Sequence, residues 1–333
     1  MTSVLPGLVN ITEIFEPVAA DMAVVEKRLG ANLIDDNPFV DELLNQVFRA
    51  GGKRIRPGLV LLCHHATATG GEDGDVDEDA VQAKDCEEQP AAEAWITAER
   101  RANGMDSGKS KSAERLWKTP RYITLAVLTE LIHSASLVHD DVIDGAQIRR
   151  GHQTVHGKWN ERVAVLLGDL LFAQASICLS QLQNPQIVGI YGRVLGDLCA
   201  GEIRQLRQQY VLNVDWEIYI HKSYCKTASL FSAGCRSAAI LNKSSDEIVR
   251  QLTGYGKNLG ICFQIVDDLL DLTGTADNLG KKTGGDLAHG IVTAPALIVL
   301  ERGDKPAEQL AGFRLLLQAS AISRCAARQH LRL

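Results

Sequence analysis

After Pro120, the apolar residues of this chain keep a helical spacing almost to residue 300. Apolar side chains recur at intervals of three and four residues within segments 121–145, 161–182, 185–210, 215–240, 245–272 and 291–300. Strand-like alternation and Asn-Gly hairpin sequences do not interrupt them. Before Pro120 the same spacing predicts helices over about 11–30, 36–50 and 53–66, with Asp36 or Asn37 as a cap before Pro38. The sequence therefore predicts an all-α fold, a helical bundle around a central cavity.

The composition fits packed helices and excludes several classes of protein. Of 333 residues, 45% are hydrophobic and 5% aromatic, so aliphatic side chains supply most of the core. The net charge of −6 argues against a protein whose main task is binding nucleic acid, although a local basic cluster can still bind a smaller anion. No uninterrupted apolar run reaches the roughly 18 residues of a membrane span. The eight cysteines lack metal-binding spacing, which favours free thiols in a reducing compartment.

Residues 70–112 differ from the rest of the chain. Nine acidic residues and one lysine lie between Gly71 and Pro90, and large apolar residues are few. Burial cannot then offset the entropy cost of ordering the segment, and the acids do not follow the spacing of an EF-hand calcium loop. We interpret 70–112 as a disordered, solvated insertion in a single domain that spans residues 1–333.

A five-residue acidic motif, DDxxD, occurs twice, each time in apolar sequence. At about 100° per residue, its first and last aspartates share a helix face. One such motif is also typical of a solvated helix surface, but carboxylates grouped on an apolar stripe are costly unless a cation neutralises them. Carboxylate oxygens suit Mg²⁺, which commonly bridges a few of them to substrate phosphates. The candidate metal ligands are Asp140, Asp141, Asp144, Asp267, Asp268 and Asp271.

Basic residues are also grouped. They lie in GGKRIRP (residues 51–57), in Arg149-Arg150, in Lys226-Thr227 and in Lys281-Lys282. Any one of these basic groups could simply form structural salt bridges. That explanation is weaker here, because four basic groups occur together with two acidic motifs. Guanidinium groups match phosphate oxygens in pairs, and lysine acts as a point charge. Carboxylates, a metal ion and these cations together predict a diphosphate-binding site.

The motif series resembles that of the trans-isoprenyl diphosphate synthases, in particular the long-chain, solanesyl-type branch of cyanobacteria and plastids. The resemblance covers residues 11–69 and 115–300, and it rests on order and spacing as well as on the motifs themselves. They are GGKRIRP, HSASLVHDDVIDGAQIRRG, GDLLFAQ, GEIRQ, KTASL, GICFQIVDDLLDLTG and LGKKTGGDL.

The resemblance implies roles for individual residues. Both aspartate motifs would hold Mg²⁺, about three ions in all, on an allylic diphosphate that Arg149 would also touch. Isopentenyl diphosphate would be bound by Lys53, Arg56, His133 and Arg150, and Arg54 is counted with these substrate-binding residues. The allylic pocket would be lined by Lys226, Thr227, Gln264 and Lys281.

The resemblance also implies a reaction and a product. Metal ions and cationic side chains would stabilise the departing diphosphate, and isopentenyl diphosphate would attack the allylic cation inside an apolar cavity. In this family, bulky aromatic residues four and five positions before the first aspartate close the product tunnel. Here those positions hold Ser136 and Ala135, so we expect a long product, beyond twenty carbons.

Several alternatives stay open. A geranylgeranyl diphosphate synthase would make a shorter product. A class I terpene cyclase normally lacks the second motif and GGKRIRP, and a phosphohydrolase of the HD type, suggested by His133, His139 and Asp140, leaves the second motif unexplained. A non-catalytic subunit of a heteromeric synthase would typically lose aspartates, but the stretch 301–333 does not resemble the usual end of the family.

The lineage also carries expectations about assembly and compartment. Family members usually form homodimers. The lineage indicates a plastid enzyme, although no transit peptide is evident at the N-terminus and a cytoplasmic location stays open.

Overall fold

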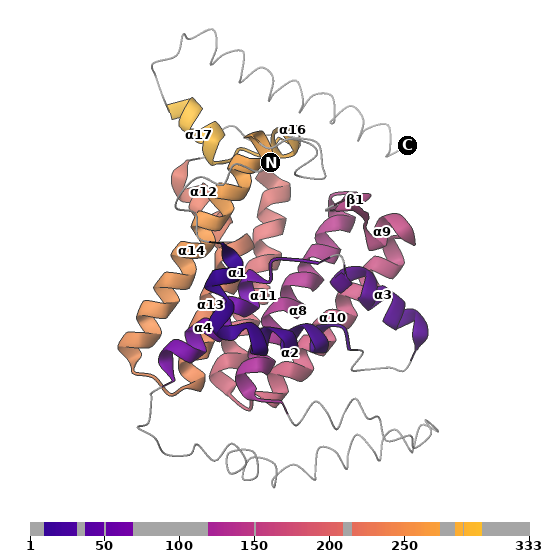
Figure 1. Ribbon diagram of the computed structural model, residues 1–333. Helices are drawn as coiled ribbons and strands as arrows, with labels where there is room; N and C mark the ends of the chain where they lie inside the picture. The colour runs from indigo at the N-terminus through magenta and orange to yellow at the C-terminus, as the bar shows by residue number, and fades with distance from the viewer. Residues whose placement is uncertain are drawn as a thin grey trace, which may run out of the picture.

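The computed structural model describes residues 10–31, 37–49, 51–68, 119–149, 151–208, 215–273, 284–288 and 290–301. Most of these residues are helical (Figure 1), which confirms the predicted all-α fold. The long helices are α2 (Ala19–Leu29), α3 (Pro38–Arg49), α4 (Ile55–Thr67), α8 (Arg121–Ile143), α10 (Glu161–Gln181), α11 (Pro185–Gln208), α13 (Ser229–Leu241) and α14 (Asp246–Thr273). The short elements are α1 (Ile11–Ile14), the 3₁₀ turn η1 (Glu16–Val18), α9 (Val155–Lys158), α12 (Trp216–Ser223), α16 (Gly285–Ala288) and α17 (Ala294–Glu301).

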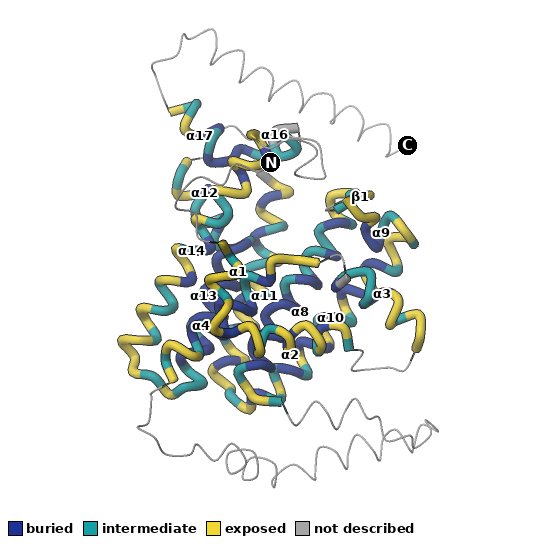
Figure 2. Tube along the Cα trace, in the orientation of Figure 1, coloured by how far each residue is buried: buried dark blue, intermediate teal, exposed yellow. Residues whose placement is uncertain are grey.

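Helix α8 is the central element of the bundle. It packs against α2, α4, α10 and α13, and most of its length is buried in Figure 2. Its side chains Leu125, Leu128 and Ile132 are entirely inaccessible to solvent. Burying an aliphatic side chain of this size contributes about 1.5–3 kcal/mol. The core therefore holds α8 firmly, and with it the acidic motif at its C-terminal end.

Polar side chains at the helix starts set where the elements begin. Asn37 accepts a hydrogen bond from the Phe39 backbone N–H at 3.0 Å, which confirms the cap predicted before Pro38. Asn160 accepts from Val163 N–H at 3.0 Å at the start of α10. Asp215 accepts from Ile218 N–H at 2.8 Å at the start of α12. These side chains satisfy amide groups that have no partner within their own helix.

The structure adds two details to the predicted elements. The helical segment predicted over 215–240 is continuous from α12 through α13, but a π-helical turn, η2 (Tyr224–Ala228), joins the two helices. Such turns often accompany functional sites, and this one carries Lys226 and Thr227. The sequence also missed a small antiparallel hairpin of β1 (Ile148–Arg149) and β2 (His152–Gln153). Strands of two residues are too short to show alternation.

Some predictions fall outside the described residues. The insertion at 70–112 lies there, as does the C-terminal stretch after Glu301. The single domain over 1–333 therefore stays a prediction.

Two of the described helices, α8 and α10, are long and apolar enough to cross a membrane by length and composition alone. The apolar window of α8 is 72% buried inside the bundle, and that of α10 is 39% buried. A core helix passes the same test, so this is weak evidence for a span.

Candidate active site

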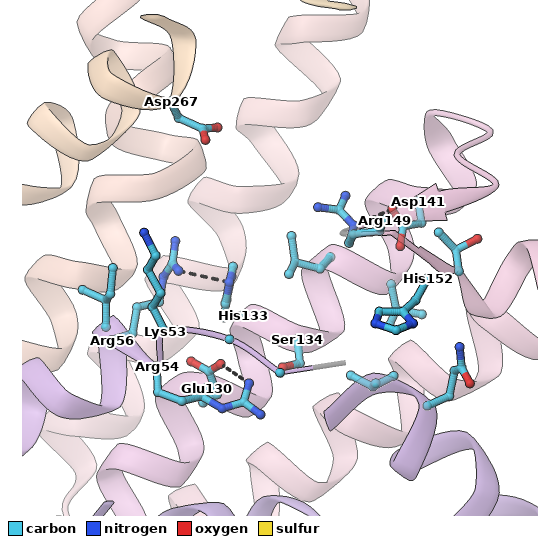
Figure 3. Close-up of a pocket in the computed structure, with 18 of the residues that line it drawn as sticks. Lys53, Arg54, Arg56, Glu130, His133, Ser134, Asp141, Arg149, His152 and Asp267 are labelled. Atoms are coloured by element: carbon cyan, nitrogen blue, oxygen red, sulfur yellow. Dashed lines mark hydrogen bonds and ion pairs between the residues drawn. The ribbon is translucent and has the colours of Figure 1, made fainter. Parts of the chain in front are cut away.

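A cavity of about 630 Å³ opens between the loop before α4, helix α8, the β1–β2 hairpin and helix α14. Figure 3 shows the cationic side chains Lys53 and Arg56 on one side, with Asp141 and Arg149 across the cavity and Asp267 above them. The structure thus brings together residues from four segments that are far apart in the sequence. Both aspartate motifs contribute one member each to the cavity wall.

The first aspartate motif lies at the C-terminal end of α8. Asp140 is half-buried, Asp141 is buried, and Asp144 is exposed at the C-cap. Asp140 and Asp144 therefore differ in burial, although they lie four residues apart, a spacing that places two residues on the same face of a helix. Arg149 donates a hydrogen bond from Nε to Oδ1 of Asp141 at 2.8 Å. In this structure the guanidinium predicted to bind the allylic diphosphate is paired with a predicted metal ligand.

Burial raises the pKa values of two carboxylates of this motif. Burial raises the pKa of Asp140 to about 6, with Glu202 and Asp144 adding to the rise and Lys226 and Arg149 opposing it. Burial also raises the pKa of Asp141, despite the hydrogen bond from Arg149. A buried group of carboxylates that resists ionisation is an environment in which a bound cation would be favourable.

The second motif is held by a chain of hydrogen bonds. Tyr219 donates to Oδ2 of Asp268 at 2.7 Å, and Gln264 donates to Oδ1 of the same carboxylate at 2.8 Å. Thr227 in turn donates to the Gln264 carbonyl oxygen at 2.6 Å. Thr227 and Gln264, predicted to line the allylic pocket, therefore also orient Asp268. Sequence reasoning missed Tyr219, because nothing in its local sequence predicts a partner 49 residues away.

Asp267 and Asp271 occupy different environments on α14. Asp267 is exposed and lines the cavity, whereas Asp271 is buried. The backbone N–H of Asp286 donates to Oδ2 of Asp271 at 3.2 Å, and Gly284 N–H donates to its backbone carbonyl at 2.7 Å. Gly284 has a φ of 73°, a conformation that favours glycine. Asp271 therefore fastens the segment that begins at Gly284 to the end of α14.

Lys226 lies in the electrostatic field of several acidic groups. Its ammonium is 3.8 Å from Glu202 on α11. Burial lowers the pKa of Lys226, but Glu202, Asp140, Asp144 and Asp286 outweigh burial and raise it overall. The π-helical turn thus places a permanently charged lysine near the first motif. Sequence reasoning missed Glu202 and Asp286, although GEIRQ and GGDL mark them in retrospect.

The basic loop supplies cations to the other side of the cavity. A nitrogen of Arg56 lies 3.0 Å from Nε2 of His133, and its guanidinium lies over the Phe231 ring at 4.7 Å. Lys53 is exposed and also lines the cavity. The structure therefore brings together three of the residues predicted to bind isopentenyl diphosphate. Arg54 also lines the cavity, but it differs in that its side chain is buried and its guanidinium is paired with Glu130 (Figure 3).

The remaining predicted residues stand as follows. Arg150 and Lys281 lie outside the described residues. Ala135 is fully buried in the core, and Ser136 donates a hydrogen bond to the His133 carbonyl at 2.8 Å. Neither residue lines the cavity described above, whose α8 wall includes Ser134, Leu137 and Val138. The chain-length hypothesis stays a prediction.

The carboxylates of the site fit a metal ion that is coordinated partly by the protein and partly by the substrate. Among the described side chains, no three histidine, cysteine or carboxylate groups come close enough to hold an ion by themselves. Mg²⁺ typically takes one or two carboxylates and completes its shell with water and phosphate oxygens. The buried carboxylates of the two motifs match that chemistry.

Comparisons with known proteins agree with this geometry. The family model described as polyprenyl synthetase matches residues 109–320. The chain is 37% identical over 294 residues to the chloroplastic solanesyl diphosphate synthase 1 of Arabidopsis thaliana, covering 88% of this chain and 62% of that protein. It is 36% identical to a prenyl transferase of Synechocystis, covering 89% and 77%. The chain therefore spans less than two thirds of the plant relative.

A solved structure extends the similarity to three dimensions. A polyprenyl synthase from Caulobacter crescentus, complexed with calcium and isoprenyl diphosphate, superimposes with a TM-score of 0.69 at 26% identity. The match covers 93% of this chain and 85% of that one.

Proposed function

The chain belongs to the polyprenyl synthetase family, and from that premise we propose that it is a trans-prenyltransferase that lengthens an allylic diphosphate with isopentenyl diphosphate. The observation that carries the proposal is the cavity itself. Lys53, Arg56 and His133 face it from one side, and Asp141 and Asp267 from the two aspartate motifs face it from others. This arrangement would bind two anionic substrates, one near the cations and the other near the aspartates.

The residues divide the chemistry between them. Magnesium ions held by the six aspartates would supply charge that stabilises the departing diphosphate. Lys226 would bind the same leaving group, since its ammonium stays charged beside Asp140 and Asp144. The allylic C–O bond breaks and the diphosphate leaves with the electron pair. The double bond of isopentenyl diphosphate forms the new C–C bond, and the departed diphosphate accepts the proton whose loss restores a double bond in the product. Apolar groups such as Phe263 and Leu270 line the cavity and would keep water from the cation.

Arg149 would change partners during binding. It now donates to Asp141, and a guanidinium matches two phosphate oxygens as well as it matches a carboxylate. The substrate diphosphate would bind Arg149 and the metal ion would bind Asp141. The present pair between these two side chains would then be replaced.

Magnesium and the diphosphate substrates are supported by analogy and by the donor set. The Caulobacter polyprenyl synthase was solved with calcium and isoprenyl diphosphate, a divalent cation and a ligand of the proposed class. The resemblance implies about three ions per site.

A long-chain product is the finer form of the proposal. Curated relatives include solanesyl and hexaprenyl diphosphate synthases, and the small side chains of Ala135 and Ser136 point the same way. Such a product would serve as the precursor of a prenylquinone side chain. Geranylgeranyl diphosphate is the shorter alternative, and a regulatory subunit is disfavoured because all six aspartates are present. The chloroplastic and cyanobacterial relatives support a plastid location.

The experiment combines purified protein, Mg²⁺, labelled isopentenyl diphosphate and either farnesyl or geranylgeranyl diphosphate. We expect label in long-chain products, resolved by chromatography. Asp267→Asn should reduce incorporation on the order of 10²-fold, since it removes a charged group from the cavity wall. Asp246→Asn, in the first turn of the same helix, is the matched control and should retain activity. Folded wild-type protein that incorporates no label would contradict the proposal.

A further inference from the structure

The loop that carries Lys53 and Arg56 has an unusual backbone. Gly51 has a φ of 71° and Arg54 a φ of 45°, so two of its residues lie in the left-handed region. Glycine adopts this conformation freely, but a residue with a Cβ rarely does unless its surroundings impose it. The next residue, Ile55, begins α4. Something must therefore hold Arg54 in place at the entrance to the helix.

The side chain of Arg54 provides that restraint. Its guanidinium donates to Glu130 on α8 at 2.9 Å, to Glu26 on α2 at 2.6 Å, and to the Phe48 carbonyl at the end of α3 at 3.1 Å. The side chains of Arg54 and Glu130 are only 7% and 6% exposed. One residue thus connects the loop to three helices. A guanidinium is suited to this role, because its fork of donors can serve several acceptors at once.

The direction of Arg54 separates it from its basic neighbours. Figure 3 shows its guanidinium beside Glu130, away from the side to which Lys53 and Arg56 extend. Burial raises the pKa of the Glu130 carboxyl, and the positive charges of Arg54 and Arg56 oppose that rise. Glu130 therefore interacts with both arginines of the cavity wall, the buried Arg54 and the more exposed Arg56.

We propose that Arg54 is a positioning residue, which, by pairing with Glu130 and Glu26, fixes the 51–56 loop so that Lys53 and Arg56 face the isopentenyl diphosphate. The sequence-based expectation that Arg54 binds substrate directly is thereby replaced. The inference rests on the proposed function for the identity of the substrate, but the placement of the loop can be measured without it.

The decisive variant is Glu130→Gln, because the two roles predict opposite results. If Arg54 positions the loop, loss of the Glu130 charge loosens it, and the KM for isopentenyl diphosphate should rise about tenfold while the KM for the allylic diphosphate changes less than about twofold. If Arg54 binds substrate, the variant frees its guanidinium, and the KM should stay the same or fall. Arg54→Lys keeps the positive charge but loses the several N–H donors of the guanidinium, and should also raise the KM for isopentenyl diphosphate.

A second measurement reads the loop itself. Amide hydrogen exchange in peptides spanning 51–56, without substrate, should become faster in Glu130→Gln and in Arg54→Lys. Glu26→Gln, at a half-exposed partner, should act in the same direction and is less of a threat to folding. The control is Tyr191→Phe, which removes a buried hydrogen bond of 2.6 Å to Thr129, the residue next to Glu130. It should lower the melting temperature but leave the loop and both KM values unchanged.

The outcomes are distinguishable. Unchanged loop exchange in Glu130→Gln, or an unchanged or lower KM for isopentenyl diphosphate, would overturn the positioning role. A wild-type protein without activity would overturn the proposed function, while faster loop exchange in the variants would still support the placement of the loop by Arg54.

Discussion

One carboxylate in this site, Asp268, depends on a tyrosine that no motif includes. Asp268 is 3% exposed and receives hydrogen bonds from Tyr219 and Gln264. Burial, and then Asp268 itself, raises the pKa of the Tyr219 hydroxyl, so it stays protonated and donates. A metal ligand oriented in this way presents its remaining lone pairs in a defined direction.

Tyr219→Phe tests that dependence. The change removes one donor to Asp268 and leaves the ring in place. We expect about a tenfold loss of incorporation and a higher Mg²⁺ concentration for half-maximal activity, which is the usual range for a partner of a metal ligand. Both are measured by titrating Mg²⁺ in the incorporation assay. Tyr255→Phe on the exposed face of α14 is the control, and an unchanged Mg²⁺ requirement in Tyr219→Phe would argue against the role.

Ala135→Tyr tests product length at a second residue. Ala135 is entirely buried in α8, so the larger side chain must displace its neighbours. If it extends into the product tunnel, we expect shorter products with the same primer. The added volume should also lower stability by about 1–3 kcal/mol. Product chromatography and thermal unfolding separate the two effects, and an unchanged product distribution would exclude Ala135 as a chain-length determinant.

At the scale of elements, two glycines let α14 approach its neighbours closely. A Cβ at Gly260 would collide with the Cα of Ala228 in η2 and lie 2.8 Å from its Cβ. A Cβ at Gly256 would lie 2.7 Å from the Phe231 carbonyl oxygen. This contact fixes the distance between the π-helical turn with Lys226 and Thr227 and the helix that carries the second motif.

Gly260→Ala should therefore disturb both stability and activity. We expect about 1–3 kcal/mol of destabilisation from overpacking against backbone atoms, with a matching loss of incorporation. Gly254→Ala on the same helix meets nothing within 4 Å and should be neutral or stabilising by about 0.5–1 kcal/mol. Chemical denaturation of both variants measures the difference. Equal stability of the two would show that α14 can move away without cost.

At the scale of the whole molecule, α10 presents an apolar face that nothing in this chain covers among the described residues. Leu166 is 67% exposed and Val165 is 41% exposed, and the apolar window of this helix is 39% buried. The family resemblance implies a homodimer, and we propose that a second copy of the chain covers this face.

Leu166→Glu tests the expected homodimer. A carboxylate buried between two copies of α10 would be strongly unfavourable, so we expect the protein to shift from dimer to monomer. Sedimentation equilibrium measures the change. Ile248→Glu, at an exposed position on α14, controls for the added charge and should leave the dimer intact. A wild-type monomer, or an unchanged dimer in Leu166→Glu, would contradict the expected interface.

The sequence by itself determined the helices and the chemistry of the site. The helical spacing of apolar residues and the capping residues such as Asn37 are properties of short stretches of sequence. The long helices could therefore be predicted before any packing was known. Two acidic motifs in apolar sequence already predicted a site for a cation. Tertiary structure alone decided which charged side chains are exposed in the cavity and which are paired with other side chains of the protein. Lys53 and Arg54 are adjacent in the sequence and both line the cavity, yet Lys53 is exposed whereas the buried guanidinium of Arg54 is paired with Glu26 and Glu130. That division depends on contacts between residues 28 and 76 positions apart, which the local sequence cannot encode.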